Sequence, residues 1–153
     1  MQEKSAGAVI FRRDEDKIFY LLLQYKQKTK YWDLPRGNIE KNEEERQTVL
    51  REVKEESGLA DIKFVDGFRE TTSWVYVREN QKIFKEVIYF LAETEEKEVT
   101  VSWEHEDYGW FEFNEAIDMM TYDNSKVILE KADKFLKRME KESLAKFLKQ
   151  KQK

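Results

Sequence analysis

The chain has 153 residues, of which 40% are hydrophobic and 39% are charged, and its net charge is −4 at pH 7. This length suits one domain that buries a core without disulfides or a structural metal, and we expect a single domain over residues 1–153. The absence of cysteine and the single histidine, His105, exclude zinc–thiolate sites, thiol nucleophiles and any mechanism that needs two histidines. No apolar run approaches the roughly 18 residues of a membrane span, and no signal-peptide pattern is present, so we expect a soluble, cytoplasmic protein without a membrane partner.

The charge is unevenly distributed along the chain. Residues 126–153 carry ten basic and four acidic side chains, a net charge of +6, which leaves −10 for residues 1–125. An acidic body does not favour direct binding of a polyanion unless metal ions mediate it. The basic end indicates a solvated helix face, and attraction of RNA or phosphate stays open as the alternative.

Two apolar runs open the chain. Ala6–Phe11 and Ile18–Tyr25 flank a charged turn and predict a β-hairpin. Residues 26–33 are polar and aromatic and predict a loop. Pro35 then restricts φ, while Gly37 is free to adopt a positive φ, so we expect a sharp entry into the next segment.

A helix is predicted after this entry. Asn42 is the expected N-cap, and the helix should stop at Gly58, the residue type favoured at a left-handed C-cap. Val49, Leu50 and Val53 lie to one side of it. One side can therefore pack on a sheet while the neighbouring side faces a cleft.

Strand-like and helical patterns alternate in the second half of the chain. The strands are expected near residues 62–70, 72–79, 82–93 and 108–113. Asn114 should cap a short helix through Met120, and a longer helix with an apolar stripe should start at Asn124. The lysine-rich segment 141–153 is expected to fray. Together these elements predict a mixed α/β fold of the α+β class.

Three carboxylates gather on one face of the first helix. At 100° per residue, Glu52, Glu55 and Glu56 fall within an arc of roughly 100°. Like charges this close destabilise a helix, which suggests that the face holds a divalent metal through its carboxylate oxygens. A solvated acidic face is the alternative, because the chain has 32 acidic residues.

The spacing around these carboxylates is more specific than their number. Nine positions are involved, separated by five, seven, one and one intervening residues: Gly37, Glu43, Arg51, Glu52, Val53, Glu55, Glu56, Gly58 and Leu59. The stretch 37–59 resembles the Nudix box at each position. That resemblance implies a Nudix fold, with a mixed β-sheet sandwiched between helices. It also implies hydrolysis of a nucleoside diphosphate linked to another moiety.

The resemblance assigns roles within the box. Glu52, Glu55 and Glu56 would coordinate Mg²⁺ or Mn²⁺, and one of them would also serve as general base. Arg51 would orient a neighbouring carboxylate, with Glu43 as its expected partner. The two glycines of the box, Gly37 and Gly58, would serve backbone geometry.

Further segments resemble the asymmetrical diadenosine tetraphosphate hydrolases within the Nudix family. They are residues 6–13, 19–25, 32–37, 85–92 and 102–110. Related Nudix enzymes that trim RNA 5′ ends share some of these segments. These outer segments are therefore less specific for one substrate than the box is for the type of reaction.

This second resemblance adds residues outside the helix. Glu104 would supply another carboxylate to the metal, and Lys85 would contact a phosphate. Tyr89 would stack on an adenine, although an aromatic residue in a strand is as often part of the core. Arg36 and Gly37 would lie beside the substrate. Further stacking candidates, each more commonly a packing residue, are Tyr31, Trp32, Trp74 and Tyr122.

The expected function is metal-dependent hydrolysis of diadenosine tetraphosphate to ATP and AMP, with water as the nucleophile. One alternative is a broader pyrophosphohydrolase that acts on RNA 5′ ends or on nucleoside triphosphates. The other is a Nudix module that senses a nucleotide without turnover. The retained carboxylates argue against the sensor, and the sequence leaves the oligomeric state open.

Overall fold

The structure is a computed structural model that describes residues 1–27 and 29–152. Residue 28 of the predicted loop and residue 153 of the predicted tail lie outside the described part. The strands are β1 (Gln2–Asp14), β2 (Lys17–Tyr25), β3 (Tyr31–Asp33), β4 (Arg36–Asn38), β5 (Lys63–Arg78), β6 (Gln81–Glu93) and β7 (His105–Phe111). The helices are α1 (Glu45–Ser57), α2 (Phe113–Met119) and α3 (Asp123–Lys151).

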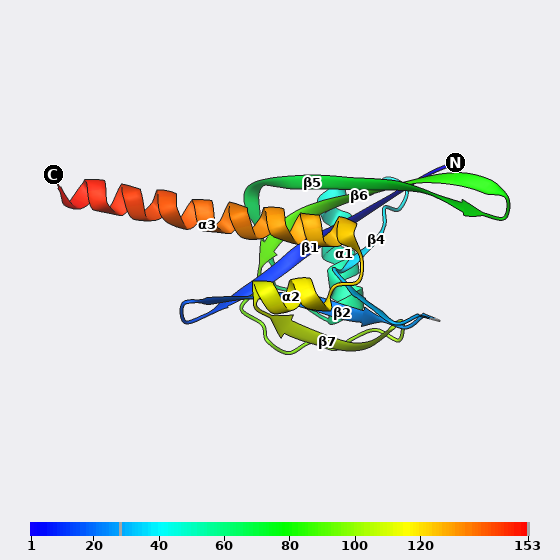
Figure 1. Cartoon of the computed structure of the whole chain (residues 1–153), viewed down its shortest axis with the longest axis horizontal. Coiled ribbons are helices and arrows are strands. Elements are labelled where there is room, and N and C mark those ends of the chain that lie inside the picture. Colours follow the sequence, from blue (N-terminus) through cyan, green and yellow to red (C-terminus); the bar gives the residue numbers. More distant parts are fainter. Residues whose placement is uncertain (28, 153) are drawn as a thin grey trace.

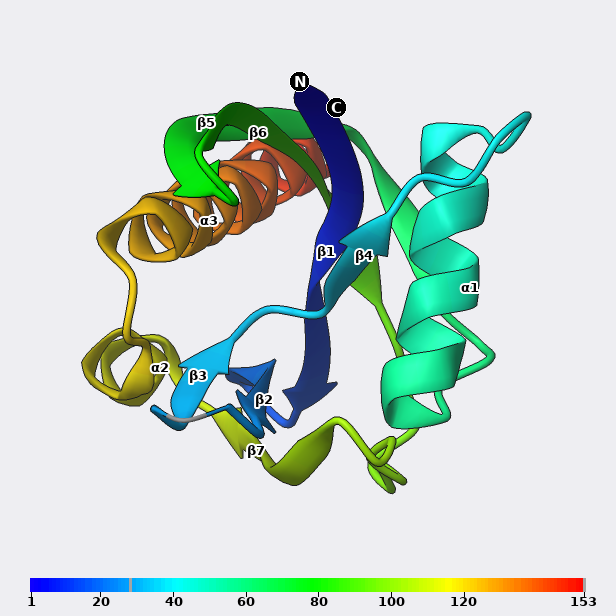
Figure 2. The same cartoon turned by 90° about the vertical axis from the view of Figure 1, so that its right-hand side faces the viewer.

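The strands form a mixed sheet. The order along its main path is β3-β2-β1-β6-β5, with β4 paired to β1 and β7 paired to β2. The β1–β6 pair is parallel, and the predicted β1–β2 hairpin is confirmed as an antiparallel pair. Figure 2 shows β1 and β6 between α1 on one side and α3 with α2 on the other. The predicted α+β class, a mixed sheet between helices, is confirmed.

The central strands are apolar on both faces because helices cover both faces. Along β6, alternate residues such as Tyr89 and Leu91 enter the core beneath α3, while Ile88 and Phe90 enter the core beneath α1. This alternation follows the two-residue period of a strand. α1 contributes Val49 and Val53 to its core, as predicted for its apolar side. Leu50, predicted on the same side, is 44% exposed, so its assignment to the packed side is wrong. The polar side of α1 is left free for chemistry.

Several predicted strands have different limits. Residues 31–33 form β3 within the predicted loop, because this segment pairs with the end of β2. The expected strands 62–70 and 72–79 are one long strand, β5, with a register shift against β6 between Phe64 and Arg69. In both cases the strand limits are set by pairing with a distant strand, which the local composition of the segment does not reveal.

Two predicted helix starts are also wrong. The N-cap of α1 is Glu44, whose N–H donates to Gln47 Oε1 at 2.8 Å, whereas Asn42 has a left-handed φ of 66° in the preceding turn. The N-cap of α2 is Glu112, two residues before Asn114. In both cases a neighbouring residue has the extended backbone that an N-cap needs.

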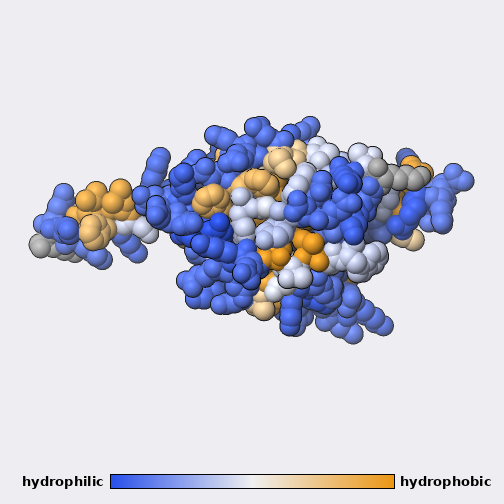
Figure 3. Space-filling view, turned by 90° about the horizontal axis from the view of Figure 1, so that it is seen from below, coloured by the Kyte–Doolittle hydropathy of each residue, from blue (hydrophilic) through white to orange (hydrophobic). Residues whose placement is uncertain are grey.

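The third helix is longer than expected. It starts at Asp123 and continues to Lys151, so residues 141–151 are helical where fraying was predicted. Figure 1 shows this end of α3 projecting from the body, and Figure 3 shows apolar side chains on it among hydrophilic ones. Leu144, Phe147 and Leu148 are exposed there. Among the described residues, no helix combines the length and apolarity needed to cross a membrane.

Candidate active site

The carboxylate face belongs to a well-ended helix. At its carboxyl end, Gly58 adopts the predicted left-handed conformation, with φ 77°, and its N–H donates to Lys54 O at 2.9 Å. A side chain would be strained at this φ, which explains the glycine. Glu52, Glu55 and Glu56 therefore lie on the last two turns of a helix with a defined end.

Arg51 holds the upstream part of the box together. Its Nε and Nη2 donate to both oxygens of Glu43 at 2.8 and 2.9 Å, so the ion pair predicted between these residues is present in a two-pronged form. Its Nη1 donates to Glu52 Oε1 at 2.6 Å and to Glu55 Oε2 at 3.4 Å. The Arg51 and Thr48 hydrogen bonds lower the pKa of Glu43 to about 2. One guanidinium thus orients three carboxylates.

The Glu52 side chain approaches the backbone of Gly37 closely. Gly37 lies in β4 opposite Ala6 of β1, and its φ is outside the positive range, so the structure does not use the freedom for a positive φ that was expected at this position. A Cβ built on Gly37 would overlap the carboxyl group of Glu52. Glycine is required because the Glu52 side chain lies directly against the backbone of β4.

Glu56 is the buried member of the carboxylate set. Its side chain is 5% exposed and accepts a hydrogen bond from the Arg36 N–H at 3.2 Å. Burial, and then the neighbouring charge of Glu52, raise the pKa of Glu56 to about 9. Burial also raises the pKa of Glu52. The site favours a compensating positive charge.

The loop after β6 closes the site from the other side. Its Ser102 N–H donates to Glu56 O at 3.2 Å, and its Glu104 O accepts from the Lys26 N–H at 2.8 Å. Glu104 thereby joins the carboxylates of α1 around one cavity of about 620 Å³, the catalytic cleft. The cleft is lined by Arg36, Gly37, Asn38, Glu40, Arg51, Glu52, Glu55, Glu56, Ser102, Trp103 and Glu104.

A second cavity, of about 320 Å³, adjoins the cleft and shares Arg36 with it. The Arg36 Nη1 donates to Asp33 Oδ2 at 2.6 Å, and its guanidinium lies 6.0 Å from the centre of the Trp74 ring. We call this the aromatic cavity. Its lining residues are Tyr31, Asp33, Arg36, Trp74, Tyr122, Asn124 and Ser125.

Of two residues predicted to bind substrate, Tyr89 is buried in the core and Lys85 lies at the edge of the cleft. Tyr89 is 1% exposed, and its hydroxyl accepts from Arg36 Nη1 at 3.3 Å. Its ring has no free face for an adenine, so the predicted stacking role does not agree with the structure. Lys85 donates from Nζ to Ser5 Oγ at 2.7 Å and to Asn38 Oδ1 at 3.0 Å, at the edge of the cleft.

Sequence reasoning missed several lining residues of these cavities, of which two matter most. Asp33 is 1% exposed and pairs with Arg36, and Trp103 is 81% exposed beside Glu104. An aspartate beside a short run of aromatic residues carries no distinctive signal in one sequence. His105 contacts Ser102 Oγ through Nδ1 at 2.8 Å and packs on Tyr25, so it has a structural role in this loop.

The carboxylates do not converge into a ready-made metal site. Within residues 1–27 and 29–152, no three acidic or histidine side chains lie in an arrangement that could hold a metal ion. Arg51 engages both Glu52 and Glu55 instead. The donor chemistry still suits a hard divalent cation, because five carboxylates line one cavity and the buried one, Glu56, has a strongly raised pKa.

Comparison with known protein families leads to the same family as the box: the NUDIX domain model matches residues 1–131. The chain belongs to the Nudix family. The asymmetrical bis(5′-nucleosyl)-tetraphosphatase of Sus scrofa is 34% identical over 146 residues, which cover 89% of this chain and 97% of that protein. The Mus musculus protein of the same name is 32% identical with the same coverage.

Solved Nudix structures agree in fold. The crystal structure of a C. elegans Ap4A hydrolase binary complex has a TM-score of 0.77 and 32% identity, covering 88% of this chain and 97% of that chain. The NUDIX domain of Shewanella oneidensis NrtR, solved with ADP ribose, has a TM-score of 0.71 at 20% identity and shares the fold. The predicted enzyme class, a Nudix pyrophosphohydrolase, is confirmed by the family and its named relatives.

Proposed function

We propose that this Nudix hydrolase cleaves diadenosine tetraphosphate asymmetrically to ATP and AMP. The observation that carries the proposal is the aromatic cavity joined through Arg36 to the carboxylate-lined catalytic cleft. A nucleobase needs an aromatic surface, whereas a phosphate chain needs cations. The relatives named as asymmetrical tetraphosphatases support this choice of substrate.

We propose Mg²⁺ or Mn²⁺ as the cofactor, held by Glu52, Glu55, Glu56 and Glu104. These side chains line the same cleft, and the absence of a Cβ at Gly37 leaves room for the Glu52 carboxyl group. When bound, the cation would neutralise phosphate charge and lower the pKa of a bound water. One of the four carboxylates would take the proton of the attacking water.

Other residues orient the components. Arg51 sets the rotamers of Glu52 and Glu55 through its Nη1 contacts, and Glu43 in turn holds Arg51. Arg36 stands between the two cavities and is fixed by Asp33. Lys85, at the edge of the cleft, adds a positive charge toward the phosphate chain.

One adenine base of the substrate would lie in the aromatic cavity. Trp74 and Tyr122 border it, and the Tyr31 ring meets the Tyr122 ring at 5.2 Å in an edge-on arrangement. Stacking of a base on an aromatic side chain contributes about 1–3 kcal/mol. These residues replace Tyr89 as the adenine-binding candidates.

A second candidate function is pyrophosphohydrolysis at RNA 5′ ends. The projecting end of α3 favours it, because residues 141–151 are exposed and lysine-rich. The test is a product assay with diadenosine tetraphosphate, nucleoside triphosphates and 5′-triphosphorylated RNA, each with Mg²⁺, Mn²⁺ or EDTA. We expect ATP and AMP from the dinucleotide in either metal and no products in EDTA.

Two other results would redirect the proposal. A clear preference for RNA or for nucleoside triphosphates would show that diadenosine tetraphosphate is the wrong substrate assignment. Binding of the dinucleotide in Mg²⁺ without any release of product would instead identify a sensor.

A further inference from the structure

Trp103 is the most exposed large hydrophobic side chain among the described residues, with 81% of its surface open to solvent. It lies between β6 and β7 and contributes to neither core cluster. Isolated exposed hydrophobic residues are common on protein surfaces, so exposure alone assigns nothing. The surroundings of this indole are what distinguish it.

The backbone on both sides of Trp103 is held in place. Before it, the Ser102 N–H donates to Glu56 O at 3.2 Å. After it, Glu104 O accepts from the Lys26 N–H at 2.8 Å, and the His105 N–H donates to Ser102 O at 3.0 Å. These bonds connect the loop to the end of α1 and to the end of β2. The exposed indole is therefore carried on a fixed loop, as a binding platform needs.

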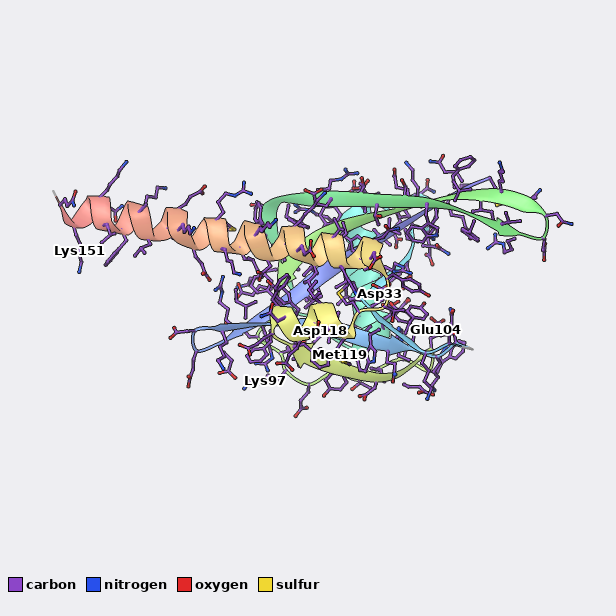
Figure 4. All side chains as sticks on the ribbon, in the orientation of Figure 1. Asp33, Lys97, Glu104, Asp118, Met119 and Lys151 are labelled. Carbon is purple, nitrogen blue, oxygen red and sulfur yellow. The ribbon has the colours of Figure 1, made fainter. Side chains whose placement is uncertain are left out.

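Trp103 borders two cavities at once. One is the catalytic cleft, and the other is a third cavity of about 240 Å³ that also includes Glu104. The remaining lining residues of this third cavity are Tyr25, Lys26 and Gln27. Figure 4 shows Asp33, of the aromatic cavity, and Glu104 on the body of the molecule, remote from Lys151 on the projecting helix.

The three cavities form a connected series. The aromatic cavity meets the catalytic cleft at Arg36, and the cleft meets the third cavity at Trp103 and Glu104. The first and third cavities share no lining residue. They are neighbours nonetheless, because Tyr31 borders the first cavity, Tyr25 borders the third, and these two rings stack 4.8 Å apart. An aromatic side chain therefore lies at each junction of the charged cleft with a neighbouring cavity: Trp74 is beside Arg36, and Trp103 is beside Glu104.

A dinucleoside polyphosphate has the matching order of groups, a base at each end of an anionic chain. We propose that Trp103 stacks on the second nucleobase, the one that lies outside the aromatic cavity. Lys26 and Gln27 offer polar groups beside it. This assignment rests on the proposed function and identifies Trp103 as a residue that selects dinucleotides over mononucleotides.

The test compares two substrates of equal phosphate-chain length, of which only one carries a second nucleoside. KM and kcat are measured with diadenosine tetraphosphate and with adenosine 5′-tetraphosphate, for the wild type, Trp103→Ala and Trp103→Phe. The alanine variant should raise KM for the dinucleotide about 5- to 100-fold, the effect of losing one base stack. Its effect on adenosine tetraphosphate should be at least fivefold smaller. The phenylalanine variant should recover most of the dinucleotide affinity, because it keeps an aromatic face.

A matched control is Phe147→Ala, which removes an aromatic side chain of 51% exposure from the projecting end of α3. It should change neither substrate's KM. Equal losses for both substrates in Trp103→Ala, or no loss for the dinucleotide, would overturn the assignment to Trp103. Failure of the wild type to cleave the dinucleotide would count against the proposed function instead. In that case calorimetric binding of both nucleotides to the wild type and Trp103→Ala still decides the role of Trp103.

Discussion

The carboxyl group of Glu52 lies against the backbone of Gly37, where the β4 strand passes the last turns of α1. This contact joins the first residue of the box to one of its carboxylates across 15 positions of sequence. It explains why glycine stands there without a positive φ. It also predicts the effect of adding a single methyl group at this position, in Gly37→Ala.

Gly37→Ala should lower kcat about tenfold or more while the protein stays folded. The added methyl group overlaps only the far end of the Glu52 side chain, which can rotate away at low cost to stability. The displaced carboxylate then no longer lines the cleft correctly, and misplacement costs catalysis. Steady-state kinetics and thermal unfolding measure the two effects. A large fall in Tm with normal kcat in the folded fraction would contradict this view.

Glu55→Gln and Glu56→Gln should each lower kcat by about 10²-fold or more, because charge stabilisation by a metal is worth several kcal/mol. Both amides keep the shape of the side chain, so folding should survive. Circular dichroism and kinetics at saturating substrate measure this, with Glu142→Gln on the exposed end of α3 as the control. Unchanged turnover in either variant would refute its role as a metal ligand.

Glu104→Gln should raise the Mg²⁺ concentration for half-maximal activity roughly tenfold, which corresponds to about 1.4 kcal/mol. Glu104 approaches the cleft from the loop, and the other three carboxylates of the set remain on α1. A metal titration of activity measures the shift. If only the maximal rate changed, with the metal dependence intact, Glu104 would be acting on the substrate or on water instead.

Glu43→Gln should destabilise the protein near neutral pH and lose this effect in acid. The Arg51 hydrogen bonds lower the pKa of Glu43 from 4.5 to about 2 in the folded state. The unfolded state therefore binds more protons between these values, and the stabilisation is complete above about pH 4.5. It disappears as the pH falls toward 2. Thermal unfolding at pH 7, 4 and 3 measures the difference in Tm from the wild type.

The same variant should also lower kcat, because Arg51 would lose the partner that holds it against Glu52 and Glu55. A difference in Tm that stays constant from pH 7 to pH 3 would show that the Glu43 charge contributes nothing to stability.

Deletion of residues 143–153 should leave Tm within about 2 °C of the wild type and leave dinucleotide turnover unchanged. Residues 141–152 are exposed, so they bury little apolar surface. If RNA 5′ ends are the substrate, the same deletion should instead weaken RNA cleavage, most strongly at low salt. Assays of both substrates at two salt concentrations separate the outcomes.

The predictions from sequence succeeded where a short segment carries its own physical reason. The end of α1 at Gly58, the β1–β2 hairpin and the pairing of Arg51 with Glu43 are all local in this sense. The predictions failed where distant segments compete. β3 exists because β2 pairs with it. Tyr89 is buried because its side of β6 packs in the core beneath α3.

By itself the sequence indicated the reaction class, because its nine spaced positions resemble the Nudix box and place three carboxylates on one helix. Spacing on one helix is set by its period, and needs no partner. Only the tertiary structure decided which aromatic residues can meet a base. Tyr89, Trp74 and Trp103 look alike in a strand or loop pattern, yet one is in the core, one borders the aromatic cavity and one stands free beside Glu104. That difference depends on which elements pack over each ring.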